Sequence, residues 1–583
     1  MPKEREDVET KSSGSPEVYQ QTKFMAWFEK AFPWLLVGGA ALGLVLMIFL
    51  PVIFFQEKTA EQLLAQSNLR LALLYTTGGA IAAFGLLETY RKNTNDRTKA
   101  NADINAALKN QEHQTKVLKE QIRQFDDNAF KERKAERRER YTKAVEQLGD
   151  EKAPIRMGGV YTLVGLVDEW LEEKSLSDDE RFKEGQVIIN NLCAYIRSPF
   201  TLASHYDELS QDSPTPEGIY KDKKEKFYAD KATLDSETDV RLSIIKEIHD
   251  RIQGPDKNTP GAWSDFEYDF SGSTFFYPID LTNSYYAKPI NFSGSTYKGW
   301  ANFSGSTYQS RADFTGSTYQ GGADFTGSTY QGGADFRNST YQDEADFTGS
   351  TYQDEADFRD STYQAGADFT GSTYQWADFT GSTYQWADFS DSTYQGRVDF
   401  RDSTYQGWAD FTGSTYQSRA DFSDSTYQGW ADFSDSAYEN ETNFSGSIFY
   451  QETYFGEDGY SNSSSCFTNH APQFYDKKKR KNTLFGSPNN DFTVDIDKGY
   501  PIDLDSKGIP LNCKFLTSEQ KEYLADKFQE IDETKSKLLE IKDPKEKEEL
   551  LKKLRSLNEE LHEWREEATT VQVEDVAAED TKS

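Results

Sequence analysis

An eleven-residue phrase, Ala-Asp-Phe-Thr-Gly-Ser-Thr-Tyr-Gln-x-x, recurs with little change between Phe270 and Phe455. The Phe anchor, which is Leu at 281, returns at steps of eleven, except for two steps of ten that lead from Phe369 through Phe379 to Phe389. An aromatic residue follows each anchor five places later. Such a unit is too short to bury its own apolar side chains, so consecutive units must stack into a solenoid.

Each phrase divides into two pentapeptides and one spare residue, as in Ala312–Gly316, Ser317–Gly321 and Gly322. The small first residue and the aromatic third residue alternate with polar ones, and this period of two places them on one face. The opposite arrangement, with the aromatics outside as a binding ladder, would leave only Ala and Ser to form a core. We therefore expect an aromatic core ladder that includes Phe292, Phe303, Phe314, Phe325, Phe336, Tyr297, Tyr308, Tyr319, Tyr330 and Tyr341.

These units resemble the pentapeptide-repeat family, whose A(D/N)Lxx pentapeptides form a right-handed quadrilateral parallel β-helix. The resemblance covers roughly residues 266–455, but this chain places Phe and Tyr at the centre of the unit and carries an eleventh residue. We expect two phrases to form one coil of 22 residues, with the spare residues pushed outwards at the corners. The two steps of ten agree with this, because together they leave a coil of four plain pentapeptides in register.

Two apolar runs precede the repeat. Residues 32–55 are long enough to span a bilayer, and residues 71–87 are at the short limit. Lys and Arg are frequent before and after this pair but sparse in the loop 56–70, which predicts a multi-pass protein with both termini and its soluble domains in the cytoplasm. The three cysteines lie far apart in sequence and predict no disulfide framework.

A polar segment at 88–139 predicts a helical stalk or coiled coil, with a weak apolar stripe at Leu108, Val117, Leu118, Ile122 and Phe125. Its basic block, residues 131–138, is either a solvated helix face or a site of attraction to anionic lipid. The two apolar runs, KAVEQLG at 143–149, IRMGGVYTL at 155–163 and the eleven-residue phrases together are similar to bacterial, largely actinobacterial, membrane-anchored pentapeptide-repeat proteins. That resemblance implies no established activity.

The expected architecture is a multi-domain α and β protein, in which a pentapeptide-repeat solenoid lies between helical segments. Residues 461–515 lack periodicity and predict a linker, whereas heptad spacing on both sides of Asp543-Pro544 predicts a helical hairpin or an oligomerising coil. The expected segments are a cytoplasmic segment (1–31), transmembrane helices 32–55 and 71–87 around an external loop (56–70), the stalk (88–139), a helical capping domain (140–262), the β-helix (263–460), the linker (461–515), the hairpin (516–568) and a disordered acidic tail (569–583).

No pattern in the chain indicates catalysis. The five histidines show no metal-ligand spacing, and phosphate-loop, HExxH and GxSxG motifs are lacking from the sequence. We therefore expect no catalytic residue, no cofactor and no bound metal, and we do not expect an enzyme.

Surface charge is more informative, because the chain carries a net charge of −33 and the repeat is strongly acidic. In a coil of 22 residues the Asp before each Phe forms two ladders on opposite sides. Such ladders favour solubility, or imitate duplex DNA, or, least favoured, bind divalent cations. The Asp candidates for an interaction surface are Asp313, Asp324, Asp335, Asp346 and Asp357, and the corner tryptophans are Trp300, Trp376, Trp386, Trp408 and Trp430.

The preferred functional hypothesis is a non-enzymatic, membrane-anchored scaffold that presents an acidic rod to unknown protein partners at the cytoplasmic face. The alternative is a DNA-mimicking binder or inhibitor of a DNA-binding enzyme such as a topoisomerase. Direct binding of nucleic acid is not expected, and the coiled-coil segments allow a homo-oligomer.

Overall fold

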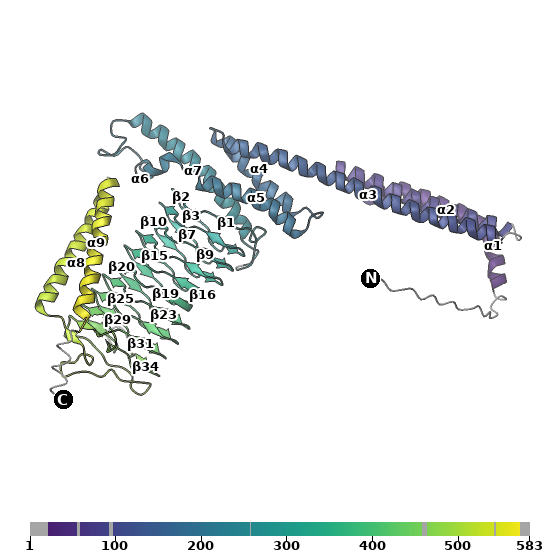
Figure 1. Ribbon diagram of the computed structural model, residues 1–583. Coiled ribbons are helices and arrows are strands. Elements are labelled where there is room, and N and C mark those ends of the chain that lie inside the picture. Colours follow the sequence, from purple (N-terminus) through teal and green to yellow (C-terminus); the bar gives the residue numbers. More distant parts are fainter. Residues whose placement is uncertain are drawn as a thin grey trace, which may run out of the picture. The chain divides into compact units, whose positions relative to one another are not determined.

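A computed structural model describes residues 21–54, 59–92, 97–256, 258–456, 463–541 and 544–571. The chain divides into two compact units, with the boundary after Arg133, inside the long helix α3 (Arg97–Leu148). Figure 1 labels the helices and strands in chain order.

The first unit contains α1 (Gln21–Phe54), α2 (Ala60–Lys92) and the first part of α3. Helices α1 and α2 contact each other, and Gly43 lies against the methyl group of Thr77. In the described part of the chain, Val37–Phe54 is the one helical segment long and apolar enough to cross a membrane. The second predicted span, 71–87, lies in the less apolar α2 and stays a prediction.

The second unit begins with a helical domain that covers the start of the solenoid. Its elements are α4 (Ala153–Leu171), α5 (Asp178–Arg197), the 3-10 helix η1 (Thr201–His205), α6 (Tyr206–Leu209) and α7 (Lys224–Ile252). Ser177 and Glu180 form a capping box at the start of α5. Helices α5 and α7 contact the first strands, and Gly185 of α5 allows the ring of Phe266 to approach closely. The domain thus protects the first aromatic side chains from solvent.

Ion pairs join the end of α3 to this domain. Lys134 pairs with Glu184 at 2.5 Å, Arg137 pairs with Glu173 at 2.9 Å, and the Arg137 guanidinium lies 4.7 Å from the ring centre of Trp170. The basic block is therefore not simply a solvated helix face, as one interpretation of the sequence had it. Lys134 and Arg137 of the block hold the end of α3 against α4 and α5, because their acidic partners lie outside α3.

The repeat folds into a parallel β-solenoid with four short strands in each coil. We number its faces 1 to 4 in chain order; most strands of faces 1 and 3 contain Asp, and most strands of faces 2 and 4 contain Tyr. Face 2 is an eleven-stranded sheet and face 3 a nine-stranded sheet. Faces 1 and 4 join into a sixteen-stranded sheet through β16 (Thr351–Asp357) and β19 (Thr373–Asp378), which run around the corner between them. The stacked rungs are visible in Figure 1.

The bounds of the strands are as follows. Face 1 consists of β1 (Tyr268–Asp269), β5 (Ile290–Asn291), β9 (Ala312–Asp313), β13 (Ala334–Asp335), β23 (Val398–Asp399), β27 (Ala420–Asp421) and β31 (Thr442–Asn443), with parts of β16 and β19. Face 2 consists of β2 (Thr274–Phe275), β6 (Thr296–Tyr297), β10 (Thr318–Tyr319), β14 (Thr340–Tyr341), β17 (Thr362–Tyr363), β20 (Thr383–Tyr384), β24 (Thr404–Tyr405), β28 (Thr426–Tyr427), β32 (Ile448–Phe449), β37 (Leu484–Phe485) and β38 (Lys514–Phe515). Face 3 consists of β3 (Ile279–Asp280), β7 (Ala301–Asn302), β11 (Ala323–Asp324), β15 (Ala345–Asp346), β18 (Ala367–Asp368), β21 (Ala387–Asp388), β25 (Ala409–Asp410), β29 (Ala431–Asp432) and β33 (Thr453–Tyr454). Face 4 consists of β4 (Tyr285–Tyr286), β8 (Thr307–Tyr308), β12 (Thr329–Tyr330), β22 (Thr393–Tyr394), β26 (Thr415–Tyr416), β30 (Ala437–Tyr438) and β34 (Cys466–Phe467), again with parts of β16 and β19.

Strand register confirms the coil of 22 residues. Thr318 pairs with Thr340, and buried serines bond across the same separation of 22 residues. Across the ten-residue steps, Thr373 pairs with Thr393, so that like residues stay in register over a separation of 20. Between Tyr352 and Glu355, β16 bulges against the shorter β19, which places the spare residue at an exposed corner.

Aromatic stacks fill the solenoid. Phe314 stacks on Phe336 with ring centres 4.9 Å apart, and Tyr319 stacks on Tyr341 at 4.7 Å. Neighbouring Phe rings such as Phe314 and Phe325 meet edge to face at 5.2 Å. Every residue of the expected core ladder is at most 1% exposed. The Tyr319 hydroxyl has no hydrogen-bond partner among the described residues, and burial raises the pKa of this phenol well above its ordinary value.

The expectation of a linker at 461–515 is wrong for its described part. Phe467 stacks on Tyr438, Phe474 on Phe444, and Phe485 on Phe449. The segment supplies β34, β37 and β38, and a small antiparallel pair, β35 (Tyr475–Asp476) and β36 (Lys481–Asn482). Its aromatic side chains extend the core but lack the eleven-residue spacing. They cover the open end of the last regular coil, where no identical coil follows.

Two antiparallel helices follow, α8 (Ser518–Glu540) and α9 (Pro544–Thr569). Leu524, Phe528 and Ile531 of α8 pack in one cluster with Leu554, Leu557 and Leu561 of α9 and with Ile448 and Leu484 of the solenoid. Lys535 donates hydrogen bonds to the side-chain oxygens of Gln385, at 2.8 Å, and Gln406. The hairpin therefore folds back along face 2, and its heptad residues are used inside the chain.

Candidate interaction surface

The Asp residues of the repeat first have a structural role. The Asp directly before a Phe usually follows an inward-pointing Ala, and its carboxylate accepts a hydrogen bond from the backbone N–H two residues later, as between Asp313 and Thr315 at 3.0 Å or Asp324 and Thr326 at 2.9 Å. This contact orders the corner that follows the strand. Because Asn291 and Asn302 accept the same bond, the corner requires the side-chain oxygen and not the negative charge.

On face 1 the Asp ladder is neutralised by arginine. Arg311 lies 2.7 Å from Asp335, and Arg337 lies 2.6 Å from Asp335 and 3.2 Å from Asp357. Burial opposes the ionisation of Asp335, but hydrogen bonds from the guanidinium and the backbone N–H of Arg337 outweigh it and hold its pKa below the ordinary value. The same pattern continues along the ladder through Arg359, Arg397, Arg401 and Arg419.

Face 3 differs from face 1. Asp324, Asp346, Asp368 and Asp388 are half-buried and accept backbone hydrogen bonds at 2.9 Å from the corners that follow them. In the described chain these four carboxylates form no ion pair within 4.0 Å, whereas the six arginines between residues 300 and 450 all pair with face 1. Along these four coils the negative charge of face 3 is therefore uncompensated.

Sequence reasoning separated two Asp ladders but missed this asymmetry. Asp313, Asp335 and Asp357 lie on face 1, and Asp324 and Asp346 lie on face 3. The signal was present: each arginine stands either directly before a face 1 strand or directly after the Phe that follows it. Counting by the 22-residue coil would have placed all of them on one side.

The five candidate tryptophans also divide by position. Trp386, Trp408 and Trp430 form a continuous stack at the corner between faces 2 and 3, with ring centres 5.3 and 6.0 Å apart. Trp300 lies at the same corner several coils earlier and is 49% exposed, and Trp430 is 38% exposed. Trp376 lies in β19, at the opposite corner between faces 4 and 1.

Glycines in adjacent coils make room for the tryptophan rings. A Cβ atom at Gly322 would overlap the ring of Trp300, and one at Gly366 would overlap the ring of Trp386. The Trp stack therefore lies flat against the corner, with the Asp strands of face 3 directly following it in sequence.

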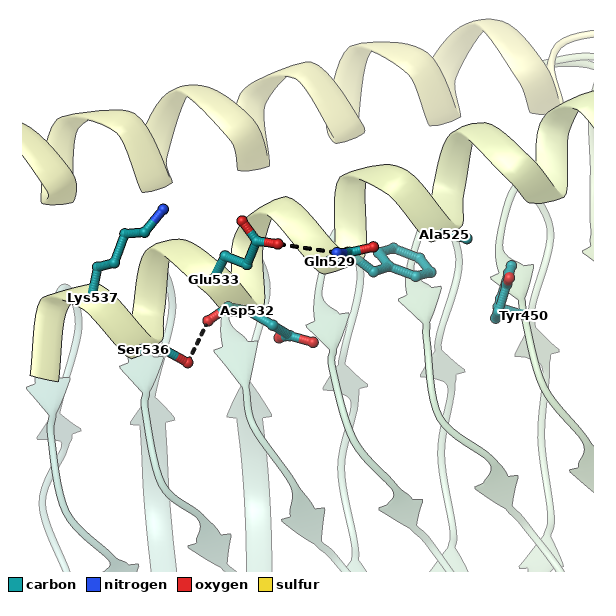
Figure 2. Close-up of a pocket in the computed structure, with 8 residues that line it drawn as sticks. Tyr450, Ala525, Gln529, Asp532, Glu533, Ser536 and Lys537 are labelled. Carbon is teal, nitrogen blue, oxygen red and sulfur yellow. Dashed lines mark hydrogen bonds between the residues drawn. The ribbon is translucent and has the colours of Figure 1, made fainter.

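A groove runs along α8 on the face 2 side of this corner. Tyr450 and Phe528 meet edge to face at 5.2 Å at one end, and the side chains of Gln529, Asp532, Glu533, Ser536 and Lys537 line the rest (Figure 2). Gln529 donates a hydrogen bond to Glu533 at 3.0 Å, and Ser536 donates one to the backbone oxygen of Asp532 at 2.9 Å. Phe449 pairs with Tyr427 of the preceding coil, so Tyr450 is equivalent to Gln428. Gln428 stands two residues before Trp430 in sequence. The groove and the Trp stack thus follow the same corner.

Comparison with known proteins bears on the repeat. A family model described as pentapeptide repeats (9 copies) matches residues 320–362. A search of curated proteins finds no match to the chain. The narrower resemblance to membrane-anchored actinobacterial members stays a prediction. The matched residues run from the corner after β10 to the first residue of β17, through consecutive coils of parallel strands. This chain is therefore a pentapeptide-repeat protein, whose repeats form the β-solenoid.

Proposed function

We propose that this protein is a non-enzymatic scaffold, anchored in the membrane by its N-terminal helices, that presents face 3 and the Trp stack to a basic protein partner on the cytoplasmic side. The observation that carries the proposal is the charge asymmetry of the solenoid. Arginine cancels the carboxylates of face 1, while the four face 3 carboxylates between residues 324 and 388 have no cationic partner within 4.0 Å among the described residues. A basic surface complements such a ladder, and the exposed Trp430 at the end of the stack offers its ring to an Arg or Lys side chain.

The periodic surface favours binding over catalysis. Successive coils present the same side chains at the same place, whereas a catalytic site needs unlike groups that converge on one reacting atom. A rigid ladder of carboxylates and aromatic rings suits recognition of an extended protein surface.

Membrane anchoring is supported by α1. Its large apolar side chains, among them Trp34, Phe49 and Phe54, are exposed, and the helix includes a segment long enough to cross a bilayer. The proposed second span at 71–87 and the cytoplasmic placement of both termini rest on the distribution of Lys and Arg around the two runs.

The DNA-mimic alternative receives less support. A duplex presents charge along both phosphate strands, but on this solenoid one of the two Asp ladders is paired with Arg. Inhibition of a topoisomerase by the purified chain, lost when the face 3 carboxylates are neutralised, would restore that alternative. Absence of inhibition at high concentration would reject it.

A matched pair of variants tests the scaffold proposal. Replacing Asp324, Asp346, Asp368 and Asp388 with Asn keeps every corner hydrogen bond, as Asn291 and Asn302 do in the native chain. The control, Asp313→Asn, makes the same change on face 1. Crosslinked partners from the native membrane, identified by mass spectrometry, are expected to include a basic protein that the fourfold variant loses and the control keeps. Equal recovery with both variants would reject face 3 as the surface.

A further inference from the structure

Helix α3 carries a row of large apolar side chains that nothing in the described chain covers. Leu108 is 54% exposed, Leu118 41%, Ile122 53% and Phe125 55%. These residues lie in the first unit, before the ion pairs that join the end of α3 to the capping helices.

The row has the spacing of a coiled-coil seam. From residue 108 the intervals alternate between three and four through Leu108, Gln111, Thr115, Leu118, Ile122, Phe125 and Ala129, which are the a and d positions of a heptad. These seven positions are all uncharged, although the residues between them include Lys109, Glu112, Lys116, Lys119, Glu120, Arg123, Asp126 and Asp127. Such segregation of charge from one stripe is typical of a helix that buries the stripe against another helix.

We propose that the α3 stripe, from Leu108 to Ala129, pairs with the same stripe of a second copy in a parallel coiled coil. The chain offers one other heptad pair, α8 and α9, and their seam residues already pack on each other and on the solenoid. This inference does not depend on the proposed partner of face 3, so each can fail without the other.

Charge at the flanking positions suits two identical parallel helices. In that arrangement the g residues Gln114 and Gln121 face the e residues Lys119 and Asp126 of the second copy, so no two like charges meet across the seam. The polar d and a residues, Gln111 and Thr115, lie between Leu108 and Leu118 in the same row. A shifted register would place these polar side chains opposite apolar ones, which destabilises the coiled coil more than the aligned register does.

Cysteine crosslinking tests the seam on the full-length protein in detergent. Ile122→Cys places a thiol on the seam, and Asp127→Cys places one on the opposite side of the same helix, equally exposed. Oxidation is expected to convert the Ile122→Cys chain to a disulfide-linked dimer at least tenfold faster than the Asp127→Cys chain. The parent chain, in which Cys193 and Cys513 are buried, sets the background. Equal rates for the two variants would overturn the proposal.

The mass in solution gives an independent readout. Light scattering of the parent protein is expected to report twice the chain mass of 66.4 kDa, and the double variant Ile122→Asp/Phe125→Asp is expected to report the single mass with unchanged helicity. Glu120→Ala/Asp127→Ala, on the far side of the helix, should keep the dimer. A parent protein of single mass would overturn the proposal. If the thiol introduced by Ile122→Cys in such a monomer became protected from labelling only on lipid vesicles, the stripe would be assigned to a lipid surface.

Discussion

The second residue after the Phe of each phrase lies at a corner and adopts a left-handed backbone conformation in coil after coil. Gly316 has a φ of +67°, Asn338 of +57° and Asp360 of +56°. In the described coils from Phe270 to Phe444, only Gly, Asn and Asp occur at this place in the phrase, because they tolerate that conformation best. The tripeptides Thr-Gly-Ser, Arg-Asn-Ser and Arg-Asp-Ser at this corner thus all provide a central residue that accepts a positive φ.

Gly316→Ala is expected to destabilise the solenoid by about 1–2 kcal/mol, because the added Cβ is strained at positive φ although no atom lies within 4 Å of it. The measurement is urea unfolding of the full-length protein, followed by tyrosine and tryptophan fluorescence. Gly316→Asn serves as the control and should lie nearer the parent, since Asn338 takes this corner one coil later. Equal losses of stability for the two variants would show that the backbone conformation is not the cause.

Arg337→Gln is expected to destabilise the coils around β13 by about 1–2 kcal/mol, a value reduced by the partial exposure of the arginine. The buried carboxylates of Asp335 and Asp357 lose a shared cation, and the pKa of Asp335 should rise. Hydrogen exchange at the amides of Phe336 and Phe358 measures the effect locally. Lys288→Gln removes an exposed cation from the solenoid and is expected to leave both amides unchanged.

At the scale of elements, the C-terminal hairpin is joined to face 2 by a mixture of apolar and charged contacts. The apolar cluster around Phe528 and Leu557 holds its base, and Arg565 lies 2.8 Å from Asp402. Further along α8, Lys535 is inserted between side-chain amides without a carboxylate at ion-pair distance in the described chain. Burial of this ammonium group lowers its pKa to about 8.

The hairpin should bind face 2 more firmly in alkaline solution. The pKa of Lys535 is about 8 when it is buried, against an ordinary value of 10.5, so docking disfavours the protonated form. The free-energy cost of burying the protonated Lys535 side chain opposes docking in full below pH 8, and it disappears as the pH rises towards 10.5. Protease resistance of α8 is expected to increase over that window. Lys535→Met should increase resistance at about pH 7 and remove the dependence, whereas the exposed neighbour Lys537→Met should retain it; a parent hairpin with no change between pH 8 and 10.5 would contradict this.

Across the whole molecule, the sequence was sufficient to predict the repeated coils but not the contacts that occur only once. The period predicted the inward aromatic side chains and, together with the resemblance to pentapeptide-repeat proteins, the coil of 22 residues, because every coil packs on a copy of itself. It failed for residues after Phe455, where Phe474 and Phe492 close the core at irregular spacing. The docking of Lys535 on Gln385 joins residues 150 positions apart, and no local pattern announces such a contact.

The two Asp faces also define what the molecule as a whole can present to a partner. On face 1 arginine pairs with the Asp ladder, whereas four carboxylates of face 3 have no cation within 4.0 Å in the described chain, and the Trp stack lies along the edge of face 3. Identical local sequences occur on both sides: Gln-Asp-Glu-Ala-Asp spans 342–346 on the way into face 3 and 353–357 on the way into face 1. A label placed at the same position in these two segments therefore has the same neighbouring sequence on face 3 and on face 1.

The most direct measurement places a photoreactive amino acid at Glu344 in one chain and at Glu355 in another, both exposed, and compares the adducts formed in the native membrane. We expect an adduct with a basic protein from position 344, beside face 3, and little or none of it from position 355, beside face 1. The same adduct at equal yield from both positions, or from position 355 alone, would contradict the assignment of face 3 as the surface that this protein presents.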